Sequence, residues 1–458
     1  MIWPNATPSG AAAPTYIRVL REARRLAVLA FPIAVSMAAA SLVLVVDTIM
    51  IAPLGTVALA AASLTSAAVM VFYSGLYGFV SVIGVRLAQA HGRGSDEDLS
   101  RTVRTGLIVA GGMGLFGAVL MASLKGGLGE IGQPPEVVAL LDGYWLAMSA
   151  MMIPFTLFYA LKGLFDAIDK PWVGVGLAFV AVAVNVPANW ILIHGVGGWE
   201  GLGLVGAGLA SLLSETVSLI LALVIWRRAK MTRAARVPLP PALSSFGRGE
   251  MGLQIREGSV IAAGYVGEGG AYAVAGLMMG WFGAAALAAN QIVGSVAAVL
   301  YMVPLGVSIA VSIRVGQAIG AGERERLVLI GKAALLVIIS WMSLVTLGLL
   351  LTGVGIARAL SEDTDVVTLA AGLFVIVAVL QIADGVQGAM LGASRGMTDN
   401  RVPVMITLVC YWVLALPVGY LLGFVLGLGP HGVWIGYGLG IGLAAVFLTL
   451  RFFAKARV

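Results

Sequence analysis

Two segments of this sequence, VRLAQAHGRG at residues 85–94 and IRVGQAIGAG at residues 313–322, decide its architecture. They lie 228 residues apart (314 minus 86), and Arg and Gln recur at matching places: Arg86 and Arg314, Gln89 and Gln317. The same offset pairs earlier residues without a gap: Gly55 with Gly283, the run 58–61 with the run 286–289, and Gly78 with Gly306. Biased composition can match Ala and Gly, but it does not explain Arg and Gln at one offset. The chain therefore contains two homologous halves.

Hydrophobic composition places both halves in a membrane. Of the 458 residues, 60% are hydrophobic and 11% are charged, whereas about 25% of the residues in a soluble domain are charged. A membrane-spanning helix needs about 20 mostly apolar residues. The sequence predicts twelve of them, at 28–52, 57–84, 105–124, 137–161, 172–194, 202–226, 258–282, 286–313, 329–352, 366–393, 402–427 and 431–450. The first stretch has full spanning length and lacks a cleavage motif, so we expect no signal peptide.

The repeat and the helix count together predict the fold class. We expect an all-α integral membrane protein with twelve transmembrane helices in two pseudo-symmetric six-helix lobes around a central cleft. Because six helices separate the copies, both copies have the same orientation, and their symmetry axis follows the membrane normal. We place an N-terminal lobe at 1–235, a basic cytoplasmic linker at 236–257 and a C-terminal lobe at 258–458. Two lobes that rock about a cleft are typical of a transporter.

Basic residues predict the orientation of the helices. Lys and Arg favour cytoplasmic loops, and all 28 of them except Lys125 and Arg358 fall in predicted loops on the side of the termini. Both termini are therefore expected in the cytoplasm. The net charge of +6 is then a signal of topology rather than of nucleic-acid binding. The single cysteine, Cys410, lies inside a predicted helix and can form no intramolecular disulfide.

Four carboxylates lie well inside predicted helices: Asp47, Glu215, Glu268 and Asp384. An ionised side chain near the bilayer centre costs at least about 2.5–3.5 kcal/mol on insertion scales. The predicted helices place no Lys or Arg at comparable depth. Each carboxylate must then be protonated, bind a cation or face water. All three states suit a protein that handles protons, sodium ions or cationic ligands.

Aromatic and polar residues accompany the two acids of the second half. Tyr265 and Tyr272 lie three and four residues from Glu268 and share its helix face. Aromatic rings beside a carboxylate suit an organic cation. Asp384 has a glutamine three residues away on either side, one of them Gln387. The alternatives are an aromatic packing stripe around a protonated Glu268, and polar contacts between helices at Asp384.

Asp47, near the end of the first predicted helix, has polar counterparts on the fifth. Asn185 and Asn189 present two amides on one helix face, and Pro187 between them frees backbone carbonyls. Carboxylate, amide and carbonyl oxygens suit a hard cation, and they also suit a proton-binding network. Ordinary packing is the alternative. Glu215 has three serines nearby, and we expect it to be neutral and hydrogen-bonded rather than functional.

Several segments together resemble the multidrug and toxic compound extrusion (MATE) family, above all its NorM branch, across nearly the whole chain. The first-half segments are LAFPIAVSM, VVDTIMIAPLG and RLAQAHGRG. The second-half segments are GEGGAYAV, ALAANQI, SIRVGQAIGAG, QIADGVQGAMLGASRG and GVWIG. The stretch from Asp384 to Gln387, followed by Arg395 and Gly396, is the most specific match.

The resemblance implies secondary active antiport driven by sodium ions or protons. It also implies two sets of site residues, in either of which a sodium ion would bind. The second-lobe set, for cation coupling and substrate binding, is Glu268, Asp384, Tyr265, Tyr272, Gln387 and Gln291. The first-lobe cation site is Asp47, Asn185, Asn189 and Ser211, the last standing where relatives often have Thr. Pro32 matches a proline that accompanies helix bending in some relatives.

The chain departs from the family pattern at four positions. Val260, Asn290 and Pro53 stand where many members have Pro, His and Gly, and Glu215 lies outside the pattern. These departures concern gating and the choice of coupling ion rather than the class of protein.

We therefore expect a multi-pass protein of a prokaryotic inner membrane that exports organic, mostly cationic drugs and dyes by alternating access. We expect a monomer in the lipid bilayer, with no cofactor, no enzymatic activity and no nucleic-acid partner. The main alternative is a lipid-linked precursor flippase of the same fold, which should line its cavity with Arg or Lys. A membrane enzyme would need a catalytic grouping and a channel would need a filter, and the sequence shows neither. It also has no GxxxxGK[ST] loop for ATP.

Overall fold

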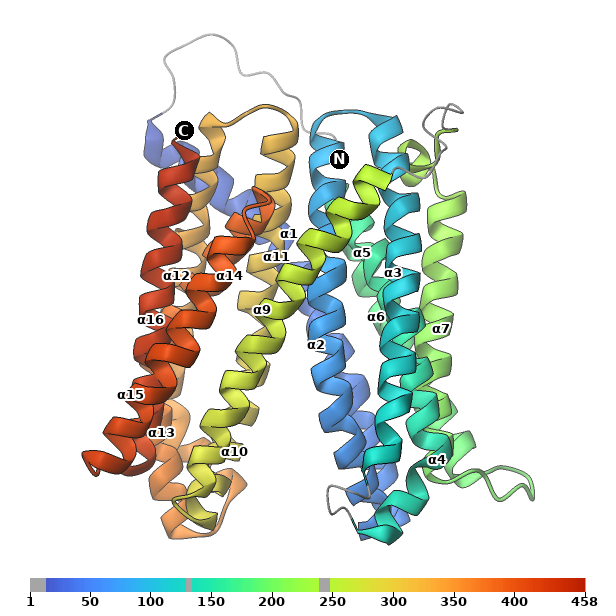
Figure 1. Ribbon diagram of the computed structural model, residues 1–458, viewed down its shortest axis with the longest axis vertical. Helices are drawn as coiled ribbons and strands as arrows, with labels where there is room; N and C mark the ends of the chain where they lie inside the picture. The colour runs from blue at the N-terminus through green and yellow to red at the C-terminus, as the bar shows by residue number, and fades with distance from the viewer. Residues whose placement is uncertain (1–13, 129–133, 239–247, 458) are drawn as a thin grey trace.

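The computed structural model describes residues 14–128, 134–238 and 248–457 (Figure 1). Within these ranges nearly every residue is helical. Twelve of the helical segments are long and apolar enough to cross a membrane. The structure thus confirms the all-α architecture and the number of spans predicted from the sequence.

The helices divide into a first and a second half of the chain. The first half consists of α1 (Thr15–Ile51), α2 (Thr56–Gly92), α3 (Asp96–Leu124), α4 (Pro135–Ala150), α5 (Met152–Ala167), α6 (Pro171–His194) and α7 (Leu204–Arg228), with short 3-10 turns η1 (Ala52–Leu54), η2 (Lys125–Gly127) and η3 (Lys230–Arg236). The second half consists of α9 (Arg248–Gly280), α10 (Ala284–Leu300), α11 (Met302–Gly320), α12 (Glu325–Leu360), α13 (Thr364–Gly396), α14 (Arg401–Leu408), α15 (Leu416–Tyr420) and α16 (Gly429–Ala456), with π-helical turns η4 (Val409–Ala415) and η5 (Leu421–Val425).

Two of the twelve spans are interrupted by a single residue, and a proline explains each break. Helix α4 ends at Ala150 and α10 ends at Leu300, four residues before Pro154 and Pro304 respectively. Because proline has no backbone N–H, the carbonyl four residues earlier loses its helical partner. Each span then continues, as α5 and α11, so that α4 with α5 and α10 with α11 cross as single segments.

The backbone repeats the sequence repeat. Gly55 precedes α2 with φ 100°, and its counterpart Gly283 precedes α10 with φ 103°. Gly94 and Gly322, in the turns after α2 and α11, have φ 65° and 75°. Positive φ is a conformation that glycine adopts without steric cost. The matched glycines therefore form matching turns, which supports the homology of the halves.

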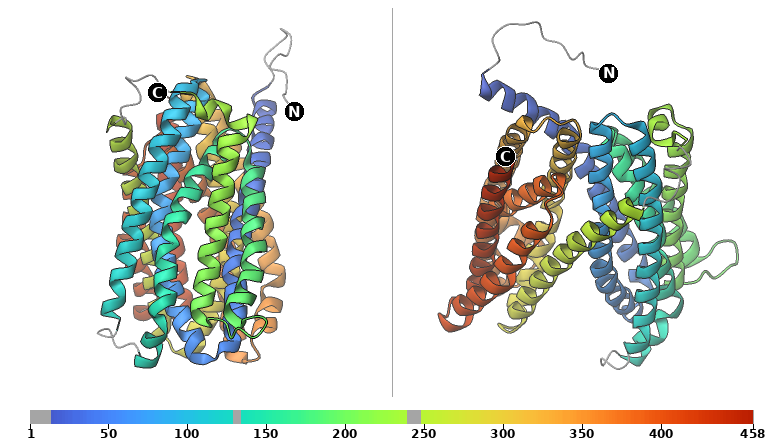
Figure 2. Two further views of the ribbon diagram at one scale, coloured as in Figure 1. Left: turned by 90° about the vertical axis from the view of Figure 1, so that its right-hand side faces the viewer. Right: turned by 45° about the horizontal axis from the view of Figure 1, so that its top comes forward.

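The first helix of each half crosses toward the other half. In Figure 1, α2–α7 stand on the right and α10–α16 on the left, while α9 begins beside α3 and runs down to α10. Figure 2 shows the first turns of α1 above the helices of the second half, where they pack against α12. We call the end of the molecule where α1 begins at Thr15 and α16 ends at Ala456 the terminal face.

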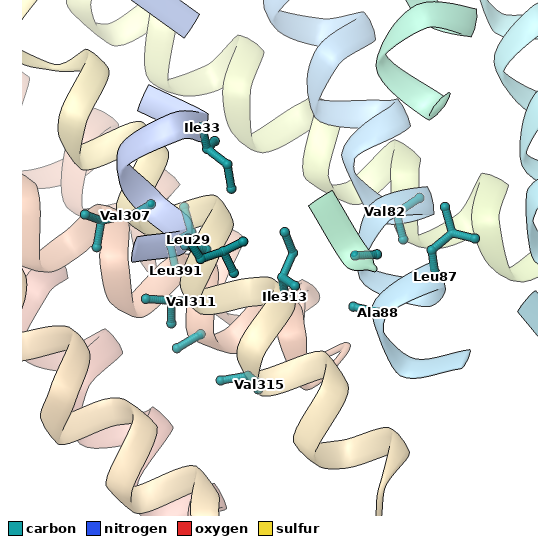
Figure 3. Close-up of a cluster of buried hydrophobic side chains, with 14 of the residues drawn as sticks. Leu29, Ile33, Val82, Leu87, Ala88, Val307, Val311, Ile313, Val315 and Leu391 are labelled. Carbon is teal, nitrogen blue, oxygen red and sulfur yellow. The ribbon is translucent and has the colours of Figure 1, made fainter. Parts of the chain in front are cut away.

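An apolar cluster shared by both halves holds them together toward the terminal face. Figure 3 shows buried side chains of α1, α2, α11 and α13 in this cluster, among them Leu29, Val82, Val311 and Leu391. Separate apolar clusters lie within the first half and within the second half. Many large apolar side chains along the helices are exposed, such as Met70, Val299 and Leu351, as expected of surfaces that face lipid.

Several helices extend beyond their predicted ends at the terminal face. Helix α2 continues to Gly92, and α9 begins at Arg248, so residues 248–257 of the predicted linker are its first turns. These turns are polar and lack the apolar pattern used to predict spans, but their packing against the opposite half keeps them helical. Of the predicted linker, residues 239–247 lie outside the described residues. The division of the chain at 235/236 and 257/258 stays a prediction.

Candidate functional site

The polar residues predicted for the first half converge on one carboxylate. Asn185 Nδ2 and Asn189 Nδ2 donate to Asp47 Oδ1 at 3.1 and 2.6 Å, and Ser211 Oγ donates to Asp47 Oδ2 at 2.7 Å. Asn189 Nδ2 also lies 3.0 Å from Asn185 Oδ1. The four side chains come from α1, α6 and α7 and are buried. The i, i+4 spacing on α6 thus brings both amides to Asp47, despite Pro187 within the helix.

This first-half cluster can hold a proton or a small cation. Its carboxylate accepts three hydrogen bonds but forms no ion pair among the described residues. Asn189 Oδ1 is enclosed and has no hydrogen-bond partner in the described part of the chain. Buried polar atoms in native proteins nearly always have partners. An unused amide oxygen beside a buried carboxylate is the donor set that a hard cation requires.

None of the three serines around Glu215 donates to its carboxylate among the described residues, and the prediction of a neutral, hydrogen-bonded glutamate stays a prediction. Ser211 Oγ donates to Asp47, Ser214 Oγ to the carbonyl of Ser211, and Ser218 Oγ to the carbonyl of Leu177. Glu215 Oε2 is enclosed and has no partner. Ser214 thus bonds to a carbonyl of the preceding turn, as helical serines commonly do, whereas Ser211 and Ser218 donate to neighbouring helices.

Glu268 of α9 is held by an aromatic residue that the sequence analysis did not identify. Tyr411 Oη, from the π-helical turn η4, donates to Glu268 Oε1 at 3.1 Å. The ring of Tyr411 stacks on Tyr437 with centroids 5.7 Å apart, and Tyr437 packs against Tyr272 at 6.2 Å. The carboxylate therefore lies beside an aromatic cluster, as expected, but Tyr411 rather than Tyr265 makes the direct contact.

The other predicted second-half residues lie in different environments. Tyr272 is 43% exposed and Gln291 is also exposed. Tyr265 turns to α13 instead, where Arg395 Nη1 donates to its hydroxyl at 2.9 Å and the guanidinium carbon lies 4.7 Å from its ring centre. Asn290, where the resemblance predicts a frequent histidine, accepts a hydrogen bond from Trp434 at 3.0 Å.

Asp384 and Gln387 of α13 complete the second-half cluster. Asp384 lies close enough to Glu268 for their charges to interact, and so does Tyr301 of the α10–α11 junction. Gln387 also lies beside Glu268, within hydrogen-bonding reach of its carboxylate, and it is buried. Two acids next to a buried amide form a site that suits a cation or a polar ligand.

Two basic residues assigned to loops lie inside the protein, which corrects the expectation of a purely acidic interior. Lys162 of α5 is 4% exposed and Arg395 of α13 is 9% exposed. Lys162 Nζ donates to Asp166 Oδ2 at 2.7 Å, whereas the charge of Arg395 is met by Tyr265 and, at longer range, by Glu268. The charge count over loops missed them because the helices extend further than their apolar cores.

A cavity of about 50 Å³ lies between the two halves and is lined by these basic residues. Its walls come from α2, α5, α9, α11 and α13. They carry three charged side chains, Lys162, Asp166 and Arg395, three tyrosines, Tyr77, Tyr159 and Tyr265, and three serines, Ser81, Ser308 and Ser312. The cavity is large enough for water and is rich in polar partners for it.

Lys162 and Arg395, which were not predicted as interior residues, share a short sequence motif. ALKG at 160–163 and ASRG at 393–396 place Lys162 and Arg395 in the same motif, one in each half. The offset of this match is 233 residues (395 minus 162) rather than 228, so it does not continue the ungapped repeat. Tyr411 had no such signal, because its contact with Glu268 joins residues 143 positions apart.

Comparison with protein families gives a match in both halves. The family model described as MatE matches residues 32–191 and 261–421. The chain is 32% identical over 99% of its length to a Bradyrhizobium diazoefficiens protein named "Probable multidrug resistance protein NorM", covering 96% of that protein. It is also 32% identical over 97% of its length to a Deinococcus radiodurans protein of the same name, covering 98% of it.

Solved structures show the same fold at lower sequence identity. The Vibrio cholerae MATE transporter VcmN in its bent form superposes with a TM-score of 0.86 at 19% identity, covering 96% of this chain and 98% of that one. The eukaryotic MATE transporter AtDTX14 gives a TM-score of 0.84 at 20% identity over 96% of this chain and 98% of that one.

Proposed function

The chain belongs to the MATE family of membrane transporters, and from this premise we propose that it is a secondary multidrug antiporter. It exports organic cations across a prokaryotic inner membrane in exchange for protons or sodium ions, with the terminal face in the cytoplasm. Membership of a transporter family agrees with the expectation that the chain is not an enzyme. The relatives named for multidrug resistance support drugs as the substrate class.

One observation carries this proposal above all. Asp47, Glu268 and Asp384 are carboxylates within membrane-spanning helices, and none forms an ion pair among the described residues. A carboxylate away from water favours a neighbouring positive charge or its own neutralisation. Unlike a structural acid, each of these three can therefore exchange one cation for another.

The two clusters support exchange by competition. The first-half cluster around Asp47 is compact and hydrogen-bonded, and it suits a proton or a sodium ion. The second-half cluster offers Glu268 and Asp384 next to the rings of Tyr411 and Tyr437, and a flat organic cation gains from both charge and ring faces. When the coupling ion occupies the first-half cluster, the two halves favour opening toward one side of the membrane. When drug occupies the second-half cluster, they favour opening toward the other side. The membrane potential adds about 2.3 kcal/mol per charge per 100 mV to ion entry.

The test is efflux of ethidium from energised membrane vesicles under proton and sodium gradients imposed separately. We expect efflux with at least one gradient in the wild type, and its loss in Asp47→Asn and Asp384→Asn. The matched control is Asp142→Asn, an exposed aspartate paired with Lys125, which should transport like the wild type. Ethidium efflux at the wild-type rate in both Asp47→Asn and Asp384→Asn would reject the proposal.

The position of Arg395 favours the alternative function, a lipid-linked precursor flippase. A site for an anionic lipid headgroup should offer Arg or Lys, and Arg395 lines the central cavity without a carboxylate partner among the described residues. In the same vesicles, a fluorescent polyprenyl phosphate lipid distinguishes the two functions. Translocation of that lipid, lost in Arg395→Gln and kept in Asp384→Asn, would establish the flippase; ethidium efflux with no lipid translocation establishes the antiporter.

A further inference from the structure

Glu215 borders a small polar cavity inside the first half. The cavity has a volume of about 20 Å³, and its lining includes Ser36 of α1, Tyr159 and Lys162 of α5, and Glu215 and Ser218 of α7. Both serine hydroxyls donate to backbone carbonyls, Ser36 to Ile33 and Ser218 to Leu177. Glu215 Oε2 is left without a partner. A space of this size holds one water molecule, which could serve as that partner.

Tyr159 and Lys162 connect this cavity with the larger one between the halves. Both residues line both cavities. In the larger cavity Asp166, which is 2% exposed, accepts from Lys162 Nζ through Oδ2, and its Oδ1 has no partner. Tyr159 lies within electrostatic reach of both Glu215 and Asp166. Two carboxylates, each with an unsatisfied oxygen among the described residues, thus border two cavities that Tyr159 also lines.

Tyr73 lies near both Glu215 and the first-half cation cluster. Tyr73 of α2 stacks on Phe155 with ring centroids 4.0 Å apart, and its hydroxyl is enclosed without a partner. It lies within electrostatic reach of Glu215 and of Asp47. The helix positions give the order of depth: Asp47 near the far end of α1, Glu215 in the middle of α7, and Asp166 at the last turn of α5, near the terminal face.

We propose that Glu215 is an intermediate proton-binding residue on a route inside the first half. The route runs from Asp47 through Tyr73 to Glu215, and from there through Tyr159 to Asp166 and the central cavity. The inference rests on the proposed antiport and specifies how a coupling proton leaves for the terminal face. Each step moves one proton: Asp47 returns to the carboxylate as Glu215 becomes neutral, and each tyrosine gives one proton and receives one.

The neighbours of Glu215 allow it to change its protonation state. From α2 and α5 it is faced by Tyr73, Tyr159 and Lys162, while the cavity walls from α1 and α6 carry no titratable group. Lys162 is already paired with Asp166 and so does not hold Glu215 permanently ionised. A carboxylate with only a structural role would have both oxygens satisfied. Protonation, with water in the cavity, supplies the missing donor.

The experiment compares Glu215→Gln, Glu215→Asp and Ser214→Ala in purified protein reconstituted into liposomes. Ser214 is buried one residue away and bonds within its own helix, so it controls for disturbance of α7. Ethidium transport is driven by an imposed proton gradient over a range of pH, ethidium affinity is measured in detergent, and gel filtration checks folding.

We expect Glu215→Gln to bind ethidium with unchanged affinity and to lose tenfold or more of proton-driven transport. Glu215→Asp should restore most of that transport with a displaced pH profile, a change that a purely structural role would not produce. Proton-driven transport at the wild-type rate in folded Glu215→Gln would overturn the route and leave the antiporter standing. Wild-type transport that a sodium gradient drives and a proton gradient does not drive would also overturn the route and leave the antiporter standing. Absence of wild-type transport under both gradients would overturn both proposals.

Discussion

Single hydrogen bonds around Asp47 are open to direct test. Asn189 donates the shortest of the three bonds to this carboxylate, and its own oxygen is unsatisfied. Asn189→Ala removes both groups from a buried site, and a lost hydrogen bond to a charged group is worth about 1.5–3 kcal/mol. We expect ion-driven ethidium efflux by Asn189→Ala to fall tenfold or more, while the variant inserts into the membrane normally. Thr352→Ala, which removes an exposed hydroxyl of α12 that bonds the carbonyl of Gly348, is the control; equal efflux in the two variants would contradict a special role for Asn189.

Asp399, in the turn between α13 and α14, gives a prediction that depends on pH. It accepts hydrogen bonds from Arg451 at 2.8 and 3.0 Å and lies 3.0 Å from Lys455 Nζ. Although burial acts to raise the pKa of Asp399, these two basic residues hold it below its usual value. Its stabilising effect is therefore complete above the unfolded pKa of about 3.9 and is lost as pH falls through the lower folded pKa.

Asp399→Asn should accordingly lower the free energy of unfolding by about 1–2 kcal/mol near neutral pH. The measurement is the melting temperature of detergent-solubilised protein at pH 7, 5 and 3.5, with exposed Glu200→Gln as control. The gap between Asp399→Asn and the wild type should be full at pH 7 and 5 and narrower at pH 3.5. A gap that widens on acidification would show that Asp399 does not act through these ion pairs.

For single residues, the sequence predicted contacts that depend on the spacing of residues within one helix. It did not predict contacts that depend on how distant helices pack against each other. Asn185 and Asn189 lie on one face whichever way the helix packs, so their pairing with Asp47 needed only that α1 and α6 be neighbours. Arg395 reaches Tyr265, and Tyr411 reaches Glu268, through packing across 130 and 143 residues. Nor could the pattern show that the serines near Glu215 have other acceptors: Ser214 bonds within α7, whereas Ser211 and Ser218 donate to α1 and α6.

Among the helices, α2 and α11 cross so closely at the terminal face that glycine is required. A Cβ on Gly92 would collide with the backbone carbonyl of Gln317, and one on Gly320 with that of Gln89. The two contacts are repeat counterparts, since each residue lies 228 positions from its mate. Gln89 and Gln317 also reach across, to the carbonyls of Gly396 and Ala167 at 3.0 and 2.9 Å.

Gly320→Ala should therefore separate α2 from α11 at the terminal face. The neighbour is backbone and cannot rotate away, so the helices must shift. Modification of a single cysteine at Ser312, in the cavity lining, by a membrane-impermeant maleimide in inverted vesicles measures the change, with Cys410 replaced by Ser. We expect modification at least several-fold faster than with unchanged Gly320. Gly348→Ala on α12, where a Cβ meets open space, should have no effect; unchanged labelling with Gly320→Ala would mean that the crossing does not close the cavity.

Element boundaries were harder to predict than element number. Apolar runs mark the part of a helix that lies in lipid, and twelve such runs gave the right number of spans. The polar turns beyond them stay helical because they pack on protein, as the first turns of α9 do against α2 and α3. A hydropathy pattern contains no information about such contacts, and for that reason Lys162 and Arg395 were placed in loops.

For the molecule as a whole, the sequence repeat extends beyond the fold to two matching ion pairs. Arg314 donates to Glu22 at 2.8 and 3.1 Å, and its counterpart Arg86 pairs with Glu250. Glu22 and Glu250 are themselves 228 residues apart. Each pair joins the first turns of α1 or α9 to the opposite half. These four residues form a pseudo-symmetric pair of ion bridges at the terminal face, here called the double bridge. The sequence repeat relates the two acids and the two arginines to each other, but the structure was needed to show that they pair.

The double bridge should bias the protein against opening at the terminal face. Glu22 is 3% exposed, and removing one partner of a buried ion pair costs about 3–5 kcal/mol when the other stays buried. In a variant that lacks the acid, the arginine is left buried without its partner. If alternating access separates the halves at this face, opening exposes that arginine to water and removes the free-energy cost of its burial. Glu22→Gln and Glu250→Gln should each shift the population toward the open state, and their combination should shift it further.

Spin labels at Glu97 and Arg324, exposed residues at the starts of α3 and α12, allow the distance between the halves to be measured by double electron–electron resonance in liposomes. The double variant should add or enlarge a longer-distance population relative to the wild type, and each single variant should give part of that change. Arg93→Gln is the matched control, because its ion pair with Asp98 lies within one half. Because Glu22 also lies 3.3 Å from Arg326 of the second half, Glu22→Gln should shift the distribution further than Glu250→Gln. A double variant with the wild-type distribution would show that the apolar cluster around Leu29 and Val311 alone keeps this face closed.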